Sequence, residues 1–84
     1  MKLTPAQRHI LLELSHRGRD SRTLRKLVGM WRVRFYFAMA DLEDLGLVET
    51  RQDIETIGDI PVVVRTYSVT RYGMGVFRES EPTK

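Results

Sequence analysis

The stretch WRVRFYF, residues 31–37, places two arginines among aromatic side chains. Guanidinium groups donate paired hydrogen bonds to guanine edges and to phosphates, so this combination suits contact with a nucleic acid. A neighbouring apolar side chain can add contact with a thymine methyl group. How these side chains act together depends on whether the stretch is a strand or the start of a helix.

Two interpretations of this stretch compete. Its polar and apolar residues alternate as they do in a half-buried strand. The segment AMADLEDLG that follows breaks the alternation and continues a helical pattern. Phe35, Ala38, Met39, Leu42 and Leu45 share one helical face at steps of three and four residues, so the sequence predicts a helix over about 31–45.

The start of this helix would be the end that enters a major groove. Arg32 and Arg34 lie about 200° apart around a helix axis and cannot both contact one base pair. If one of them contacts a base, we expect the other to bind a phosphate to one side. Tyr36 suits a phosphate contact, and Val33 or Phe37 suits a thymine methyl group. The competing interpretation packs Trp31, Tyr36 and Phe37 against the hairpin or a second subunit, and leaves the arginines solvated.

Further candidate DNA contacts lie outside this helix. Arg22, Thr23 and Lys26 fall at or near the start of a preceding helix, where positioning contacts with phosphates are expected. Arg51 and Arg65 are the only basic residues in the two predicted strands, and hence the candidates there for contacts with the DNA backbone. A solvated polar face is the competing explanation for the helical residues.

The charge distribution supports a polyanionic partner. Residues 1–34 carry nine basic and two acidic side chains, a formal charge of +7, whereas residues 35–84 carry five and nine, a formal charge of −4. Such asymmetry is typical of a chain whose first half meets a polyanion, with double-stranded DNA as the expected partner. There is no cysteine, no signal peptide and no apolar run near the roughly 20 residues of a membrane span, so we expect a cytoplasmic protein.

Two helices are predicted before residue 31. The first begins at a capping box formed by Thr4 and Gln7, with Pro5 at the first helical position. The second begins at Asp20 or Ser21. Gly18 and Gly29 follow the two helices, whose apolar stripes are Ile10, Leu11 and Leu14, and Leu24, Leu27 and Val28.

The remainder of the chain predicts a hairpin and one more helix. Residues 47–54 and 62–69 are rich in β-branched residues, and the segment between them predicts a hairpin with a long tip. Thr70 would cap a short final helix, although Gly73 and Gly75 each cost about 1 kcal/mol relative to alanine. The order predicts an α+β winged helix-turn-helix with three helices, a two-stranded β-hairpin wing and a short C-terminal helix. Residues 1–80 would form this domain, followed by a disordered tail over 81–84.

In this order the segments resemble winged-helix transcription regulators of the PadR and MarR families. LRKLVGM (24–30) is similar to the first helix and turn of their helix-turn-helix. FAMADLEDLGLVE (37–49) is similar to the end of the recognition helix and the first wing strand, and YSVTRYG (67–73) to the return strand and last helix. The resemblance implies a small transcriptional regulator that reads a DNA sequence with the helix over about 31–45 and works as a dimer.

The chain departs from this pattern in two places. Arg25 stands where many relatives have a small residue packed against the recognition helix. The hairpin is also more acidic than a wing that follows phosphates usually is, with four carboxylates against two arginines. This acidity favours an alternative function, a protein-interaction module that uses the aromatic face of the third helix and the acidic hairpin.

The sequence offers little for catalysis or metal binding. His9, Glu13 and His16 share one helical face at steps of four and three, but no further ligand completes a metal set. No phosphate-binding glycine loop, nucleophile elbow or cysteine nucleophile is present, so we expect no enzyme, no metal and no cofactor. No small-molecule ligand is identifiable. A homodimer would use Leu12 and the final helix as contacts.

Overall fold

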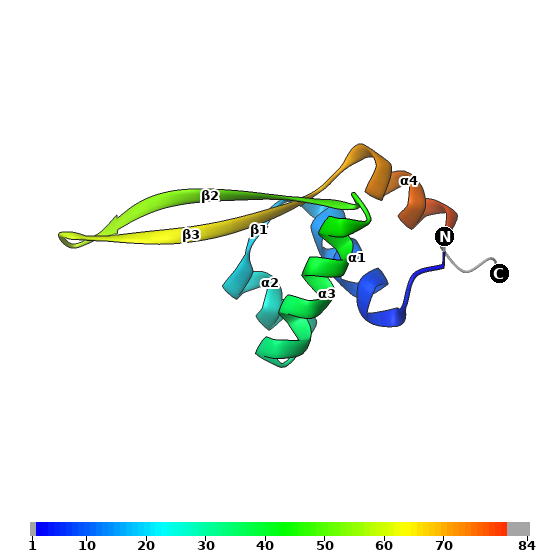
Figure 1. Cartoon of the computed structure of the whole chain (residues 1–84), viewed down its shortest axis with the longest axis horizontal. Coiled ribbons are helices and arrows are strands. Elements are labelled where there is room, and N and C mark those ends of the chain that lie inside the picture. Colours follow the sequence, from blue (N-terminus) through cyan, green and yellow to red (C-terminus); the bar gives the residue numbers. More distant parts are fainter. Residues whose placement is uncertain (1, 81–84) are drawn as a thin grey trace.

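The computed structural model describes residues 2–80, a helical body from which a long hairpin projects (Figure 1). The body contains α1 (Pro5–His16), α2 (Ser21–Val28), α3 (Arg32–Asp44) and α4 (Arg71–Glu79). The hairpin consists of β2 (Val48–Ile57) and β3 (Ile60–Val69), and β1 (Arg19–Asp20) pairs with β3. The predicted α+β winged helix-turn-helix is confirmed. The predicted tail over 81–84 lies outside the described residues.

The capping residues predicted for the first two helices are present. Thr4 Oγ1 accepts a hydrogen bond from the Gln7 backbone N–H at 3.1 Å, and Gln7 Oε1 accepts one from the Thr4 N–H at 2.9 Å. Asp20 caps α2 by accepting from the Thr23 N–H at 3.1 Å. Gly29 ends α2 in the left-handed conformation, with φ 65°, which glycine adopts without steric cost.

The prediction that Leu27 belongs to the buried stripe of α2 was wrong. Leu24 and Val28 are buried, whereas the Leu27 side chain is 44% exposed. The helix has only eight residues and packs along one side. Leu24 and Val28, four residues apart, fill the narrow surface with which α2 contacts the core, and Leu27 lies at the margin of that surface.

The disputed stretch is helical. α3 begins at Arg32, after Trp31 in extended conformation, and buries Phe35, Met39 and Leu42 against the body. The Leu45 side chain is 41% exposed, so its place in the predicted apolar stripe was wrong. The helix has ended by then, and Gly46 turns the chain with φ 76° so that Leu47 enters the core instead.

The wing is longer and its turn tighter than the sequence predicted. β2 and β3 pair in antiparallel register from Val48 opposite Val69 to Ile57 opposite Ile60. The predicted long tip was therefore wrong, since only Gly58 and Asp59 connect the strands. Gly58 has φ 64° at the first turn position, the pattern of a type II′ hairpin turn, whose twist matches that of the strands.

The sheet has three strands in the order β1-β3-β2, not the two predicted. Arg19 lies opposite Tyr67 and Asp20 opposite Thr66. A strand of two residues has no periodicity to detect, which explains why it escaped prediction. It fixes the start of α2 against the base of the wing.

α4 forms despite its two glycines, and one of them is required. A Cβ at Gly73 would lie 2.1 Å from the Leu47 carbonyl oxygen, whereas a Cβ at Gly75 would meet nothing within 4 Å. Thr70 caps the helix through the Gly73 N–H at 2.9 Å, and its hydroxyl donates to the Gly46 carbonyl at 2.7 Å. Because Gly73 has no side chain, α4 can pack closely against the Leu47 backbone, where the wing begins.

A single apolar core joins the helices to the base of the wing. Tyr67 enters it from β3, with its ring edge-on to Phe35 at a centroid distance of 6.3 Å. Its other buried members are Leu3, Ile10, Leu11, Leu14, Leu24, Val28, Met39, Leu42, Leu47, Val48, Val76 and Phe77. None of the described helices is long and apolar enough to cross a membrane.

Candidate nucleic-acid interface

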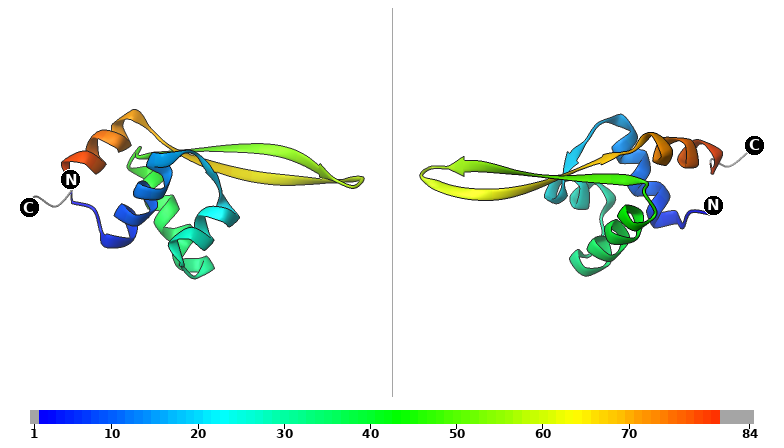
Figure 2. Two further views of the ribbon diagram at one scale, coloured as in Figure 1. Left: turned by 180° about the vertical axis from the view of Figure 1, so that it is seen from behind. Right: turned by 45° about the horizontal axis from the view of Figure 1, so that its top comes forward.

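The start of α3 lies against α2 on the side of the body from which the wing projects, as the views in Figures 1 and 2 agree. A surface hollow of about 580 Å³ lies between α2 and the start of α3. We call it the basic hollow, because its lining consists of Ser21, Arg22, Arg25, Lys26, Arg32 and Tyr36. It brings together residues from both helices of the helix-turn-helix.

No carboxylate is among the residues that line the basic hollow. Residues 21–37 contain five basic side chains and no acidic one. Within residues 2–80 the one ion pair is His9 with Glu13, so the basic groups of the hollow have no acidic partner there. Clustered, solvated cations of one sign attract a polyanion and are favourable for phosphate binding.

Arg34 lies on another side of α3. It lines a separate groove of about 420 Å³ together with Ala6, Met30, Phe37, Ala38 and Asp41. The separation of Arg32 from Arg34 that helical geometry predicts is therefore present. Arg34 has a carboxylate and an aromatic ring among its neighbours, whereas Arg32 has other cations.

The outward face of α3 between these two sites is apolar. A shallow groove of about 390 Å³, which we call the α3 groove, is lined by Arg32, Val33, Tyr36, Phe37 and Ala40. The side chains of Val33 and Phe37 are 65% and 69% exposed, and that of Trp31 is 82% exposed. These residues are available to a partner and are not part of the core.

The remaining sequence candidates do not join the basic hollow. The Thr23 N–H donates to the capping carboxylate of Asp20 at 3.1 Å, and hydrogen bonding with Thr23 is the main cause that lowers the pKa of Asp20. In the wing, Arg65 lies opposite Gln52 and Arg51 opposite Thr66, in adjacent pairs of the ladder. Successive pairs point to opposite faces, so the two arginines lie on opposite faces of the wing.

Arg65 is held close to the body. A hydrogen bond with the Tyr67 side chain is the main cause that raises the pKa of Arg65, and the negative charge of Glu43 raises it further. Burial raises the pKa of the Tyr67 phenol, against the opposing effect of Arg65. Glu43 also accepts a hydrogen bond from the Thr50 hydroxyl, which ties the second half of α3 to the wing.

Arg25 is the residue that the sequence interpretation missed. It stood out only as a departure from the expected small residue, yet it lines the basic hollow beside Arg22 and Lys26. The signal was present in the spacing, because residues three and four apart on a helix lie on one face.

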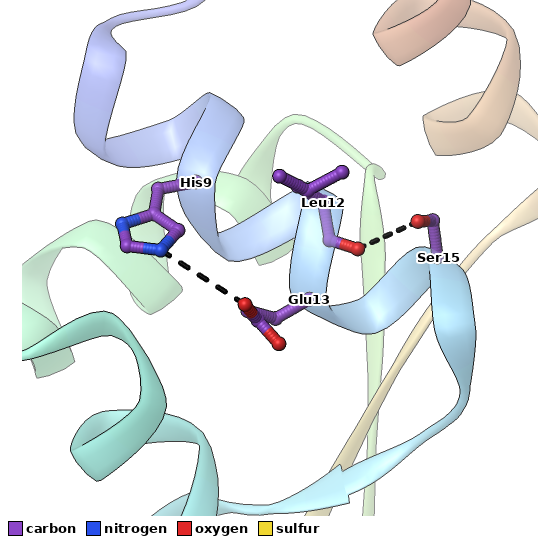
Figure 3. Close-up of polar contacts among 4 residues, drawn as sticks. All are labelled: His9, Leu12, Glu13 and Ser15. Carbon is purple, nitrogen blue, oxygen red and sulfur yellow. Dashed lines mark hydrogen bonds and ion pairs between the residues drawn. The ribbon is translucent and has the colours of Figure 1, made fainter.

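The polar face of α1 shows no metal site. His9 Nε2 lies 4.0 Å from Glu13 Oε1, and Ser15 donates a hydrogen bond to the Leu12 carbonyl at 2.6 Å (Figure 3). The described residues contain no group of three or more histidine, cysteine, aspartate or glutamate side chains placed to hold a metal. His16 has no part in the contact between His9 and Glu13.

No protein-family model and no curated protein sequence matches this chain. Solved structures match its fold. The zinc-responsive MarR family member ZitR from Lactococcus lactis matches with a TM-score of 0.77 at 20% identity, over 94% of this chain and 51% of that one. AdcR, the adhesin competence repressor from Streptococcus pyogenes, matches with a TM-score of 0.75 at 23% identity, over 94% and 55%.

A mutant of Lactococcus lactis ZitR in complex with DNA also matches, with a TM-score of 0.70 at 22% identity, over 93% of this chain and 50% of that one. The chain spans about half the length of these proteins. One is described as a member of the MarR family and another as a repressor. The predicted resemblance to winged-helix regulators is thus confirmed, and the fold of this chain is the MarR-type winged helix.

Proposed function

We propose that this protein is a sequence-specific double-stranded-DNA-binding protein that acts as a small transcriptional regulator. The observation that carries the proposal is the basic hollow, an acid-free cluster of four cationic side chains contributed by both helices of the helix-turn-helix. A winged-helix neighbour in complex with DNA supports the same conclusion. In this account α3 enters the major groove through its first two turns.

Each basic group has a role that follows from its neighbours. Arg22, Lys26 and Arg32, together with Arg25, bind phosphates, because they share one hollow and neutralise adjacent backbone charges. Arg34 lies apart from this cluster and contacts a base edge, where its paired donors suit guanine. Val33 and Phe37 offer apolar contact to thymine methyl groups, and Tyr36 a hydroxyl to a phosphate.

The other sequence candidates have smaller roles. Thr23 lies in the first turn of α2 next to the Asp20 carboxylate. A phosphate bound by its hydroxyl would therefore lie beside that negative charge. Arg51 and Arg65 lie on opposite faces of the wing, so one at most follows the DNA backbone. A homodimer that presents two copies of α3 to a two-fold operator would use Leu12, which is exposed on α1, and α4.

Fluorescence anisotropy on a labelled mixed-sequence duplex tests the proposal. At about 50 mM salt we expect binding whose affinity falls steeply as salt rises, because neutralised phosphates release counterions. The variant Arg22→Ala/Arg25→Ala/Lys26→Ala should bind more weakly and with a smaller salt slope. Lys2→Ala, at an exposed lysine before α1, is the control. Absence of binding at low salt contradicts the proposal.

The exposed apolar side chains of α3 favour a second candidate function, a protein-interaction module. Trp31, Val33 and Phe37 are largely exposed and line or border the α3 groove. A protein partner held by this groove would associate with little dependence on salt and with no need of Arg22 or Lys26. The salt titration therefore separates the two functions.

A further inference from the structure

The outer part of the wing exposes apolar side chains that no described residue covers. Ile57 and Ile60, the pair next to the turn, are 65% and 68% exposed. Figures 1 and 2 show the hairpin extending well beyond the helices in every view. A two-stranded ribbon is at best marginally stable in water, and exposed apolar clusters mark contact surfaces. The wing therefore needs a partner surface.

One face of the wing combines apolar and acidic side chains. Asp53 lies opposite Val64, Glu55 opposite Val62, and Ile57 opposite Ile60. These pairs alternate with pairs that point to the other side, so their side chains share one face. We call it the acidic wing face. Its members are Asp53, Glu55, Ile57, Ile60, Val62 and Val64.

The α3 groove has the complementary character. Val33, Tyr36, Phe37 and Ala40 supply an apolar lining with Arg32 at its edge. Residues 21–37 around it carry a formal charge of +5, whereas the wing, residues 48–69, carries four acidic and two basic side chains, a formal charge of −2. Apolar surface thus meets apolar surface, and the carboxylates of the wing face meet the basic edge of the groove at Arg32.

The charges also decide which partner fits the wing. Four carboxylates repel the phosphates of DNA, and two wings of equal charge repel each other. The wing of the same chain projects away from the start of α3 and does not fold back on it (Figure 1). A second copy of the chain carries the complementary groove.

We propose that the acidic wing face of one copy docks on the α3 groove of a second copy. Where a two-fold axis relates the two copies, the contact is made twice and the pair closes as a dimer. This dimer covers Arg32, Val33 and Phe37, so self-association and DNA binding through α3 exclude each other. The contact itself is independent of the proposed DNA binding and is tested on the protein alone.

Analytical ultracentrifugation over a wide range of protein concentrations, without DNA, tests the proposal. We expect a reversible monomer–dimer equilibrium that weakens as salt rises. Asp53→Lys/Glu55→Lys in the wing, and separately Arg32→Glu in the groove, should each raise the dissociation constant at least about tenfold, because like charges then face each other. Arg17→Glu, the same change of charge as Arg32→Glu at an exposed residue beyond the end of α1, should leave it unchanged.

Mixing the two variants gives the sharpest result. The lysine wing of one variant then meets the Arg32→Glu groove of the other, and the native wing meets the native groove. An equimolar mixture should therefore regain the self-association that each variant alone has lost. The substituted positions are exposed, and far-UV circular dichroism verifies that each variant folds. A monomer at every concentration, a dimer insensitive to these changes, or a mixture without recovery overturns the proposal.

Discussion

Arg32 and Arg34 leave the first turn of α3 toward different neighbours. Arg32 lines the basic hollow with the cations of α2, and Arg34 lines a groove that contains Asp41. The two side chains therefore sit in different electrostatic surroundings although only Val33 separates them in sequence. This difference is the reason why we propose a phosphate contact for Arg32 and a base-edge contact for Arg34.

Replacing each arginine separately should give different losses of DNA binding. Arg32→Ala should weaken binding about equally on all sequences and reduce the salt slope by about 1, as expected for one phosphate contact. Arg34→Ala should cost about 1–3 kcal/mol on the preferred sequence and relax the preference at one position. Anisotropy titrations on a selected site and on scrambled duplexes separate the two. Equal loss of sequence preference in both variants would contradict the assignment.

Lysine substitutions sharpen the same comparison. A lysine keeps the charge but loses the paired geometry of the guanidinium group. Arg32→Lys should therefore retain most of the binding, whereas Arg34→Lys should lose sequence preference as Arg34→Ala does. If Arg34→Lys binds as the parent chain does, Arg34 acts as a charge and not as a base contact.

The wing arginines should not act together. Arg51 and Arg65 point to opposite faces, and Arg65 is already engaged by Tyr67. No more than one of Arg51→Ala and Arg65→Ala should lower the salt slope of DNA binding. Salt titrations of both variants check this, and an equal fall in slope for each would show that the DNA contacts both faces of the wing.

Gly73 and Gly75 form a matched pair for stability. Gly73→Ala should lower the free energy of unfolding by about 1–3 kcal/mol or more, because its Cβ collides with the Leu47 carbonyl. Gly75→Ala meets open space and should raise that free energy by up to about 1 kcal/mol, since alanine favours the helix. Urea denaturation followed by circular dichroism measures both. Equal effects would mean that α4 does not pack on the start of β2 as described.

Asp20 links stability to pH. Hydrogen bonds from Thr23 lower the pKa of its carboxyl below the ordinary 3.8. The ionised cap therefore stabilises the fold above that value, and the contribution is lost as the pH falls through the lowered pKa. Asp20→Ala should cost about 1 kcal/mol near neutral pH, and Asp20→Asn much less, because asparagine also caps. Denaturation curves from neutral to acidic pH should show that Asp20→Asn removes this part of the acid sensitivity.

The helices were predictable because their signals are local. Thr4 with Gln7, Asp20, Gly29 and Thr70 act within a few residues of their own position, and the structure uses each of them as the sequence indicates. The helical stripe through Phe35, Ala38, Met39 and Leu42 also outweighed the alternation of WRVRFYF. The prediction for Leu45, the last residue of that stripe, was wrong because Leu45 lies beyond the end of the helix.

The features that escaped prediction depend on contacts between distant segments. β1 exists through its pairing with β3, and the length of the wing through a cross-strand register that continues to a two-residue turn. Gly73 looked unfavourable for a helix until its contact with Leu47 was known. The spacing of Arg22, Arg25 and Lys26 was visible in the sequence, but that Arg32 joins them follows only from the packing of α3 beside α2.

The proposed DNA contact through the start of α3 is tested most directly by the fluorescence of Trp31. This is the one tryptophan of the chain, and it lies largely exposed immediately before α3. At a fixed low protein concentration, we expect duplex DNA to shift and quench its emission along the same titration curve that anisotropy reports. Binding by anisotropy with unchanged Trp31 emission, or no binding at low salt, would contradict the account.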